Sequence, residues 1–205
     1  MKTNRHLVVF AKEPRLGRVK TRLGHDIGLQ LATQFYRRTL ADILMSLGND
    51  SRWNCWLALS PDNAIRGRPF WPKSFTAVEQ GKGDIGERMG RIMADLPPGP
   101  LVIIGTDIPA IRPHHIKAAF KAVGSHDVVF GPAQDGGYWL VGAKRSPCTP
   151  ELFKNVRWSN ENCLSDSLAK AKQKKLKVAL LETLEDVDDG MSYQKFIIGF
   201  LSNEA

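Results

Sequence analysis

At 205 residues the chain is long enough for one substantial hydrophobic core, and its 42% hydrophobic and 24% charged residues exclude a disordered protein. No apolar run approaches the roughly 20 residues of a membrane-spanning helix, and the run at residues 7–11 is too short for a signal-peptide core. We therefore expect a cytoplasmic protein without a membrane span. The net charge of +8 favours a polyanionic partner. Nucleic acid is less favoured than a nucleotide, because no reading module or interleaved aromatic residues accompany the basic residues.

Strands and helices are predicted to alternate along the chain. Strands are expected at residues 7–11, 53–59, 75–78, 101–104, 127–130, 138–141 and 177–181. Helices are expected at residues 28–47, 84–96, 113–123, 160–175 and 192–201. This order predicts an α/β fold in which residues 1–205 form a single domain. It is a three-layer α/β/α, Rossmann-like arrangement with a mostly parallel mixed sheet.

Three charged segments follow predicted strand ends. A basic loop follows residues 7–11, Asp107 follows residues 101–104, and an acidic cluster at residues 186–189 follows the last strand. Open α/β sheets bind ligands at the carboxyl ends of their strands. If these strands are parallel, the three segments meet at one edge of the sheet, and we expect the ligand site there.

The basic loop, residues 12–24, carries five cations within eleven residues. They are Lys12, Arg15, Arg18, Lys20 and Arg22. Arginine forks and lysine ammonium groups can surround a di- or triphosphate, and Gly17 lets the backbone approach it closely. The earlier glycine that a Walker A loop requires is absent. The alternative is a solvated basic loop without a ligand.

The acidic residues at the strand ends are candidates for metal ligands. Asp107 directly follows a buried strand, and such a carboxylate is a good ligand for a hard cation, although it also suits a turn before Pro109. Asp186 and Asp188 are at positions i and i+2 of an extended segment and therefore face one side. The alternative is that Asp188 or Asp189 caps the last helix.

The sequence Asp-Gly-Gly-Tyr at residues 135–138 is a candidate substrate site. Its paired glycines admit a ligand close to the backbone, and Asp135 can accept hydrogen bonds from a hydroxyl-bearing substrate. It also predicts a hairpin turn, and both interpretations are compatible. His114 and His115 follow Pro113 in a predicted first helical turn, so we expect them to be solvated and expect no zinc site.

Six motifs in chain order resemble those of a known family. The run FAKEPRLGRVKTRL at residues 10–23 is similar to the signature of small bacterial nucleotide-diphospho-sugar transferase-like proteins, which have the GT-A fold and are often labelled glycosyltransferases. These proteins are similar in turn to the guanylyltransferases of coenzyme F420 and molybdenum-cofactor biosynthesis. The further matches are at residues 80–89, 105–109, 131–138, 158–159 and 186–188. The chain departs from the family after Asp188, where Thr-Pro-x-Asp is usual and Asp-Gly-Met-Ser is present.

The resemblance and the charged motifs together assign roles to individual residues. Nucleotide or phosphate binding is expected at Ala11, Lys12, Arg15, Gly17, Lys20, Thr21, Arg22, Gln80, Gly83 and Arg88. Acceptor or sugar binding is expected at Asp135, Gly136, Gly137 and Tyr138. The resemblance implies Mg²⁺ or Mn²⁺ held by Asp107 and Asp188, and the catalytic residues are expected to be Asp107, Lys20 and Asp135.

The sequence therefore predicts a metal-dependent transferase with a nucleotide-activated donor and a small-molecule acceptor. The family resemblance favours a glycosyltransferase that uses a nucleotide-diphospho-sugar. The dense cations suit a triphosphate, so a nucleotidylyltransferase that releases pyrophosphate is the alternative. A non-catalytic nucleotide- or nucleic-acid-binding protein is a more distant one, and steep salt dependence of binding would mark it. The base, the sugar, the acceptor and the oligomeric state stay open.

Overall fold

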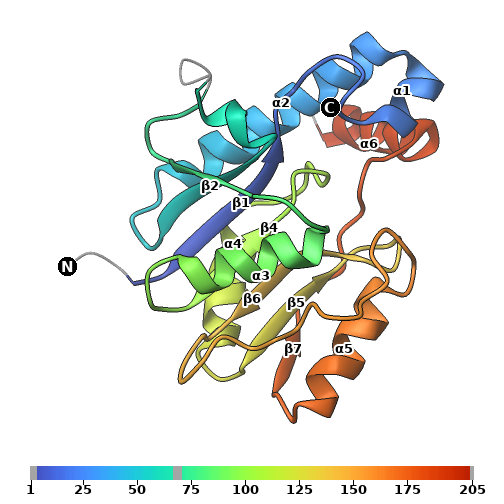
Figure 1. Cartoon of the computed structure of the whole chain (residues 1–205). Helices are drawn as coiled ribbons and strands as arrows, with labels where there is room; N and C mark the ends of the chain where they lie inside the picture. The colour runs from blue at the N-terminus through green and yellow to red at the C-terminus, as the bar shows by residue number, and fades with distance from the viewer. Residues whose placement is uncertain (1–3, 67–70, 204–205) are drawn as a thin grey trace.

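A computed structural model describes residues 4–66 and 71–203, and within these ranges the strands form one seven-stranded sheet (Figure 1). The strands are β1 (His6–Lys12), β2 (Asn54–Ser60), β3 (Thr76–Glu79), β4 (Leu101–Ile104), β5 (Val128–Pro132), β6 (Tyr138–Ala143) and β7 (Val178–Leu180). Their order is β3-β2-β1-β4-β6-β5-β7. Only β6 runs antiparallel to its neighbours, β4 and β5. The mostly parallel mixed sheet predicted from the sequence is confirmed.

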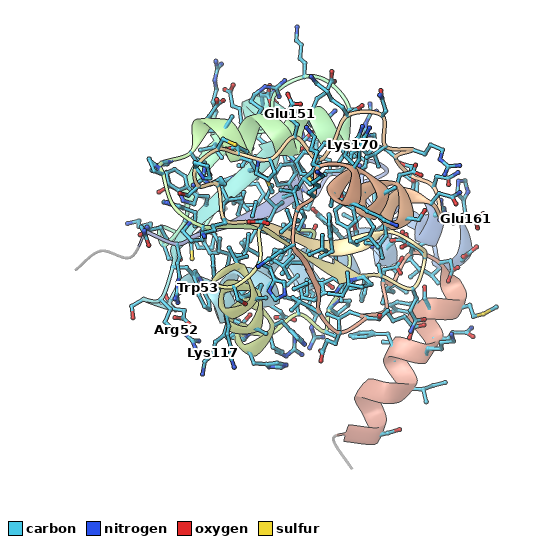
Figure 2. All side chains as sticks on the ribbon, turned by 90° about the horizontal axis from the view of Figure 1, so that it is seen from below. Arg52, Trp53, Lys117, Glu151, Glu161 and Lys170 are labelled. Atoms are coloured by element: carbon cyan, nitrogen blue, oxygen red, sulfur yellow. The ribbon has the colours of Figure 1, made fainter. Side chains whose placement is uncertain are left out.

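Helices cover both faces of the sheet and complete the three predicted layers. They are α1 (Thr21–Ile27), α2 (Leu29–Gly48), α3 (Ile85–Asp95), α4 (Pro113–Val123), α5 (Cys163–Gln173), α6 (Gly190–Asn203) and the short 3-10 helix η1 (Asp62–Arg66). Helix α4 lies on one face of the sheet and α5 on the other (Figure 2). On β1, Leu7 and Val9 pack toward α2 and α4, whereas Val8 and Phe10 pack toward α3 and α5. Because side chains alternate along a strand, an apolar run buried on both faces is what a central strand needs.

Several helix boundaries differ from the prediction, most clearly the starts of α1 and α5. Residues 21–24 were expected in the basic loop but begin α1, a helix of seven residues. Gly24 lies inside it, where a Cβ would meet Leu29 Cδ2 at 2.7 Å, so the glycine reflects close packing and not a loop. The helix expected from residue 160 begins at Cys163, because Asn160 Oδ1 accepts the backbone N–H of Asn162 at 2.9 Å and holds a turn there.

The start of α3 follows the sequence signal closely. Asp84 accepts the backbone N–H of Glu87 at 2.8 Å, and Glu87 accepts that of Asp84 at 2.9 Å. This reciprocal pair is the capping box expected from the spacing, and it satisfies two N–H groups that the helix leaves without partners. Among the described residues, no helix is both long and apolar enough to cross a bilayer.

Candidate active site

A cavity of about 360 Å³ opens at the carboxyl ends of β1 and β4. This is the sheet edge at which open α/β folds bind ligands, and the volume is within the range of small-molecule sites. Its lining includes ten of the expected site residues: Ala11, Lys12, Lys20, Gln80, Arg88, Asp107, Asp135, Gly137, Tyr138 and Asp188. Six expected residues lie outside the lining: Arg15, Gly17, Thr21, Arg22, Gly83 and Gly136. Their direct contact with a ligand stays a prediction.

Lys20 joins the two expected metal ligands in this cavity. Its Nζ lies 2.6 Å from Asp107 Oδ1 and 2.6 Å from Asp188 Oδ1. The lysine side chain is 4% exposed, whereas those of Asp107 and Asp188 are 57% and 39% exposed. Burial alone would lower the pKa of Lys20, but the charges of the two carboxylates outweigh it and raise that pKa. The basic loop, the β4 end and the acidic segment therefore meet at one edge, as their positions after strands predicted.

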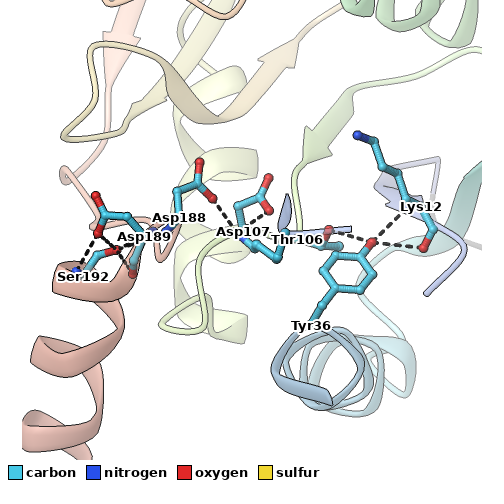
Figure 3. Close-up of polar contacts among 8 residues, drawn as sticks. Lys12, Tyr36, Thr106, Asp107, Asp188, Asp189 and Ser192 are labelled. Carbon is cyan, nitrogen blue, oxygen red and sulfur yellow. Dashed lines mark hydrogen bonds and ion pairs between the residues drawn. The ribbon is translucent and has the colours of Figure 1, made fainter. Parts of the chain in front are cut away.

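The neighbouring Asp189 caps α6, whereas Asp188 contacts Lys20 in the cavity. Figure 3 shows Asp189 directed toward Ser192, whereas Asp188 lies beside Asp107. Asp189 Oδ1 accepts the Ser192 backbone N–H at 2.8 Å, which caps the start of α6. The helix cap and the candidate metal ligand are thus two adjacent residues. Capping of α6 by Asp189 leaves Asp188 available to the cavity.

The carboxylates of this cavity have the chemistry of a hard-cation site. Asp107 and Asp188 already converge on one cation, the Lys20 ammonium, which acts as a stand-in for a metal ion. Carboxylate oxygens are the ligands that Mg²⁺ and Mn²⁺ prefer. Asp186 lines the same cavity, and burial, followed by the charge of nearby Asp135, raises its pKa. The residues present therefore fit a divalent cation held by Asp107 and Asp188.

Tyr36 fixes the first turn of the basic loop, a role that the sequence did not reveal. Its hydroxyl accepts the Lys12 backbone N–H at 2.9 Å and donates to the Lys12 carbonyl at 3.1 Å, and Thr106 donates to it at 3.3 Å (Figure 3). Burial raises the pKa of Tyr36 to about 12, so it stays a neutral phenol. Tyr36 occurs at helical spacing within the apolar stripe of α2, where it is indistinguishable from a core residue.

Gln80 and Arg88 form the cavity wall beside β1. Gln80 Nε2 donates to the carbonyls of Ala11 at 3.3 Å and Ala58 at 2.9 Å. Arg88 donates from Nε to the Gly83 carbonyl at 2.8 Å and from Nη1 to Gln80 Oε1 at 3.5 Å. These contacts tie the segment before α3 to the ends of β1 and β2. Contact of Gln80 with a nucleotide base stays a prediction, since its amide nitrogen already bonds to two carbonyls.

The opposite wall is the turn between β5 and β6, which is the hairpin expected at residues 135–138. Asp135 Oδ1 accepts the Gly137 backbone N–H at 2.8 Å, which fixes the carboxylate at the cavity. Gly136 has φ 84°, and a Cβ there would lie 2.0 Å from the Glu161 carbonyl oxygen, so only glycine fits. Tyr138 also lines the cavity, but its hydroxyl is buried with no hydrogen-bond partner among the described residues.

Trp158 completes this wall, and its place depends on Gly86 in α3. A Cβ on Gly86 would lie 2.3 Å from Trp158 Cζ2, whereas a Cβ on Gly90, one turn later, would meet Phe153 at an ordinary 3.6 Å. We expect Gly86→Ala to destabilise the fold by about 1–3 kcal/mol through overpacking. Gly90→Ala is the matched control and should be neutral or stabilising by up to about 1 kcal/mol, since alanine favours helix. Urea unfolding of both variants measures this, and equal stabilities would contradict the packing.

A second group of metal-type side chains lies outside the lining of this cavity. Ligand atoms of His114, His115 and Glu182 lie within 4.8 Å of one another. Nδ1 of His115 accepts the Arg112 backbone N–H at 2.9 Å, and its Nε2 lies 2.5 Å from Glu182 Oε1. A neutral imidazole has one accepting and one donating nitrogen, so Nε2 carries the proton toward Glu182. Burial lowers the pKa of His115 and favours this neutral form. The expectation that His115 is solvated was wrong, and the contact is a hydrogen bond that anchors α4.

The mixed sheet and the cavity at its edge define an α/β protein of the GT-A and nucleotidyltransferase-like class. The chain belongs to the family described as "Uncharacterized protein conserved in bacteria" (DUF2064), whose model matches residues 39–160. A comparison with curated proteins gave no match.

Solved structures share this fold. A crystal structure of a candidate nucleotide-diphospho-sugar transferase from Desulfovibrio desulfuricans G20 is 27% identical, with a TM-score of 0.84 over 91% of this chain and 83% of that one. The 4-diphosphocytidyl-2C-methyl-D-erythritol synthase of Anaerococcus prevotii is 9% identical, with a TM-score of 0.60 over 98% and 100%. Glucosyl-3-phosphoglycerate synthase of Mycobacterium tuberculosis, solved with Mn²⁺ and UDP, is 12% identical, with a TM-score of 0.55 over 90% and 71%. The last two show the fold alone.

Proposed function

We propose that this chain is a metal-dependent glycosyltransferase that takes a sugar from a nucleotide-diphospho-sugar. The observation that carries this proposal is the convergence of Asp107 and Asp188 on one cation position in the cavity. Such a carboxylate pair would hold a divalent ion, which would supply positive charge to a donor diphosphate. The likeness to the Desulfovibrio protein, named for nucleotide-diphospho-sugar transfer, supports the same donor class.

The charges of the cavity suit a diphosphate with its metal ion. Of the five loop cations, only Lys12 and Lys20 line the cavity. The positive charge of Lys20 is balanced by the carboxylates of Asp107 and Asp188. Arg88 adds a third cation from α3. Asp107 and Asp188 would hold the ion, which would supply positive charge to the departing diphosphate. Lys12 and Arg88 would bind the phosphate oxygens and orient the donor.

In the proposed transfer, the bond between the anomeric carbon and the diphosphate oxygen breaks, and the bonding electrons leave with the nucleoside diphosphate. The acceptor hydroxyl oxygen forms the new bond to that carbon and gives up its proton. Asp135 is the proposed proton acceptor, because its carboxylate lines the cavity and is held in place by Gly137. The walls made by Tyr138 and Trp158 would exclude water from the sugar.

Nucleotidyl transfer is the second candidate, in which a nucleoside triphosphate would lose pyrophosphate to a phosphorylated acceptor. The observation that favours it is the density of cations on the basic loop, since Arg15, Arg18 and Arg22 are exposed next to the cavity-lining lysines. Side chains of this length can turn toward a longer phosphate chain.

The experiment is a thermal-shift screen of nucleotides and nucleotide-sugars, with and without Mg²⁺ or Mn²⁺. A ligand that binds only the folded state raises the melting temperature according to its occupancy. We expect a metal-dependent shift with one nucleotide-sugar, followed by release of nucleoside diphosphate when an acceptor library is added. Release of pyrophosphate from a triphosphate would support the second candidate instead. No shift with any nucleotide in the presence of metal would overturn both.

A further inference from the structure

The Lys20 ammonium occupies the position where the two candidate metal ligands converge. It lies at the same distance, 2.6 Å, from one oxygen of Asp107 and one of Asp188. Divalent Mg²⁺ or Mn²⁺ binds carboxylate oxygens at about 2.0–2.2 Å, so an ion on the same two oxygens would take nearly the same place. Ammonium and metal ion would then be separated by less than a van der Waals contact, with like charges. The two cations exclude one another.

The conformation of Lys20 places a buried ammonium between two partly open carboxylates. Lys20 precedes α1 with φ 46° and ψ 45°, in the left-handed region that non-glycine residues rarely adopt. Its side chain is buried, whereas the two carboxylates are partly open to solvent. The carboxylates are therefore accessible to an entering ion, and the ammonium between them is the obstacle.

We propose that Lys20 closes the metal site of the free protein and opens it only when a donor phosphate draws the ammonium away. This inference rests on the proposed function, because it takes Asp107 and Asp188 as the metal ligands. Lysine has a flexible four-carbon stem with a compact charge, so its ammonium can exchange partners without movement of the backbone. Lys12 and Arg88 line the same cavity, and a phosphate bound between them offers Lys20 a new anionic partner. Metal and donor then bind with positive coupling, each raising the affinity for the other.

The test is Mn²⁺ binding, measured by the EPR signal of free aqueous Mn²⁺, with and without inorganic pyrophosphate as the phosphate probe. Protein-free titrations correct for Mn²⁺ held by pyrophosphate itself. The wild type is expected to bind Mn²⁺ weakly alone and about tenfold or more tightly with pyrophosphate, as is usual for coupled sites. Lys20→Met should bind Mn²⁺ about tenfold or more tightly than the wild type without pyrophosphate, and should gain much less from the probe.

Matched variants separate this mechanism from a general change in charge. Arg18→Met removes one positive charge from the same loop, but Arg18 is exposed and does not line the cavity. Without pyrophosphate, this variant should change Mn²⁺ affinity by less than about twofold, because exposed charges are screened by salt. Lys20→Gln keeps a polar side chain and should show the same gain in Mn²⁺ affinity. It replaces Lys20→Met in the test if circular dichroism shows that Lys20→Met folds poorly. Asp188→Asn added to Lys20→Met should remove the gain.

The outcomes distinguish the inference from the function beneath it. If Asp107→Asn abolishes pyrophosphate-dependent Mn²⁺ binding but neither Lys20 variant gains affinity, the metal site stands and the role of Lys20 is overturned. If Arg18→Met gains as much as Lys20→Met, the effect is general electrostatics and the inference is again overturned. If no variant binds Mn²⁺ under any condition, the proposed metal site is wrong and the inference is overturned with it.

Discussion

Asp107→Asn and Asp188→Asn are each expected to lower metal-dependent transfer by at least about 100-fold, because each removes charged ligand atoms from a site that stabilises the leaving group. Asp189→Asn should retain activity within about twofold, since asparagine caps helices as well as aspartate does. Asp188 and Asp189 are adjacent, yet one contacts Lys20 at 2.6 Å and the other caps α6 through Ser192. Both replacements remove one negative charge from the same segment. A difference in activity between Asp188→Asn and Asp189→Asn therefore reports where each side chain points.

The measurement is the initial rate of nucleoside diphosphate release over a range of Mg²⁺ or Mn²⁺ concentrations. Wild-type protein treated with EDTA gives the rate without metal, and the two inactive variants should approach it. Asparagine is close in shape to aspartate, and Lys20 keeps one carboxylate partner in either inactive variant, so circular dichroism should show all three variants folded. Equal losses at Asp188 and Asp189, or full activity of Asp107→Asn, would contradict the assigned metal ligands.

The alternation of strands and helices could be predicted because each central strand is a short apolar run that packs on both faces. The strand expected at residues 101–104 and the helix expected at residues 113–123 match β4 and α4 at both ends. Pro100 directly precedes the strand and Pro113 is the first residue of the helix, and these prolines mark where the two elements begin. Where such signals are missing, the predicted and observed boundaries differ. In α1, Gly24 lies inside the helix but has the sequence character of a loop residue.

The edge of the candidate site could also be predicted, because residues after parallel strands meet at one side of the sheet. The partners within it could not. Lys20 was expected on phosphate, yet it bridges Asp107 and Asp188, and a contact across 168 positions in the chain leaves no local pattern. Either Asp188 or Asp189 could cap the last helix or bind a metal ion. Only the residue at which α6 begins shows that Asp189 is the cap. Tyr36 was hidden for the opposite reason, because its spacing is that of a core residue.

The largest effect on stability is expected at Arg145, just after β6. Its guanidinium donates to four main-chain carbonyls at and beyond the end of α3. These are Gly99 at 2.7 Å, Met93 at 2.8 Å, Leu96 at 3.0 Å and Pro97. The last carbonyls of a helix have no partner within it, and a cation there also interacts favourably with the helix dipole. One side chain thus links the end of α3 to the sheet that α3 covers.

Arg145→Ala is expected to lower the free energy of unfolding by about 2–4 kcal/mol, because several charged hydrogen bonds are lost at once and water replaces only some of them. Arg145→Lys keeps the charge but not the fork of donors, so about 1–2 kcal/mol should still be lost. Lys144→Ala is the matched control: Lys144 is exposed and adjacent, and its replacement should change stability by less than about 0.5 kcal/mol. Urea unfolding measures all three. If Arg145→Lys were as stable as the wild type, charge alone would account for the contact, and the fork geometry would have no part in holding α3 to the sheet.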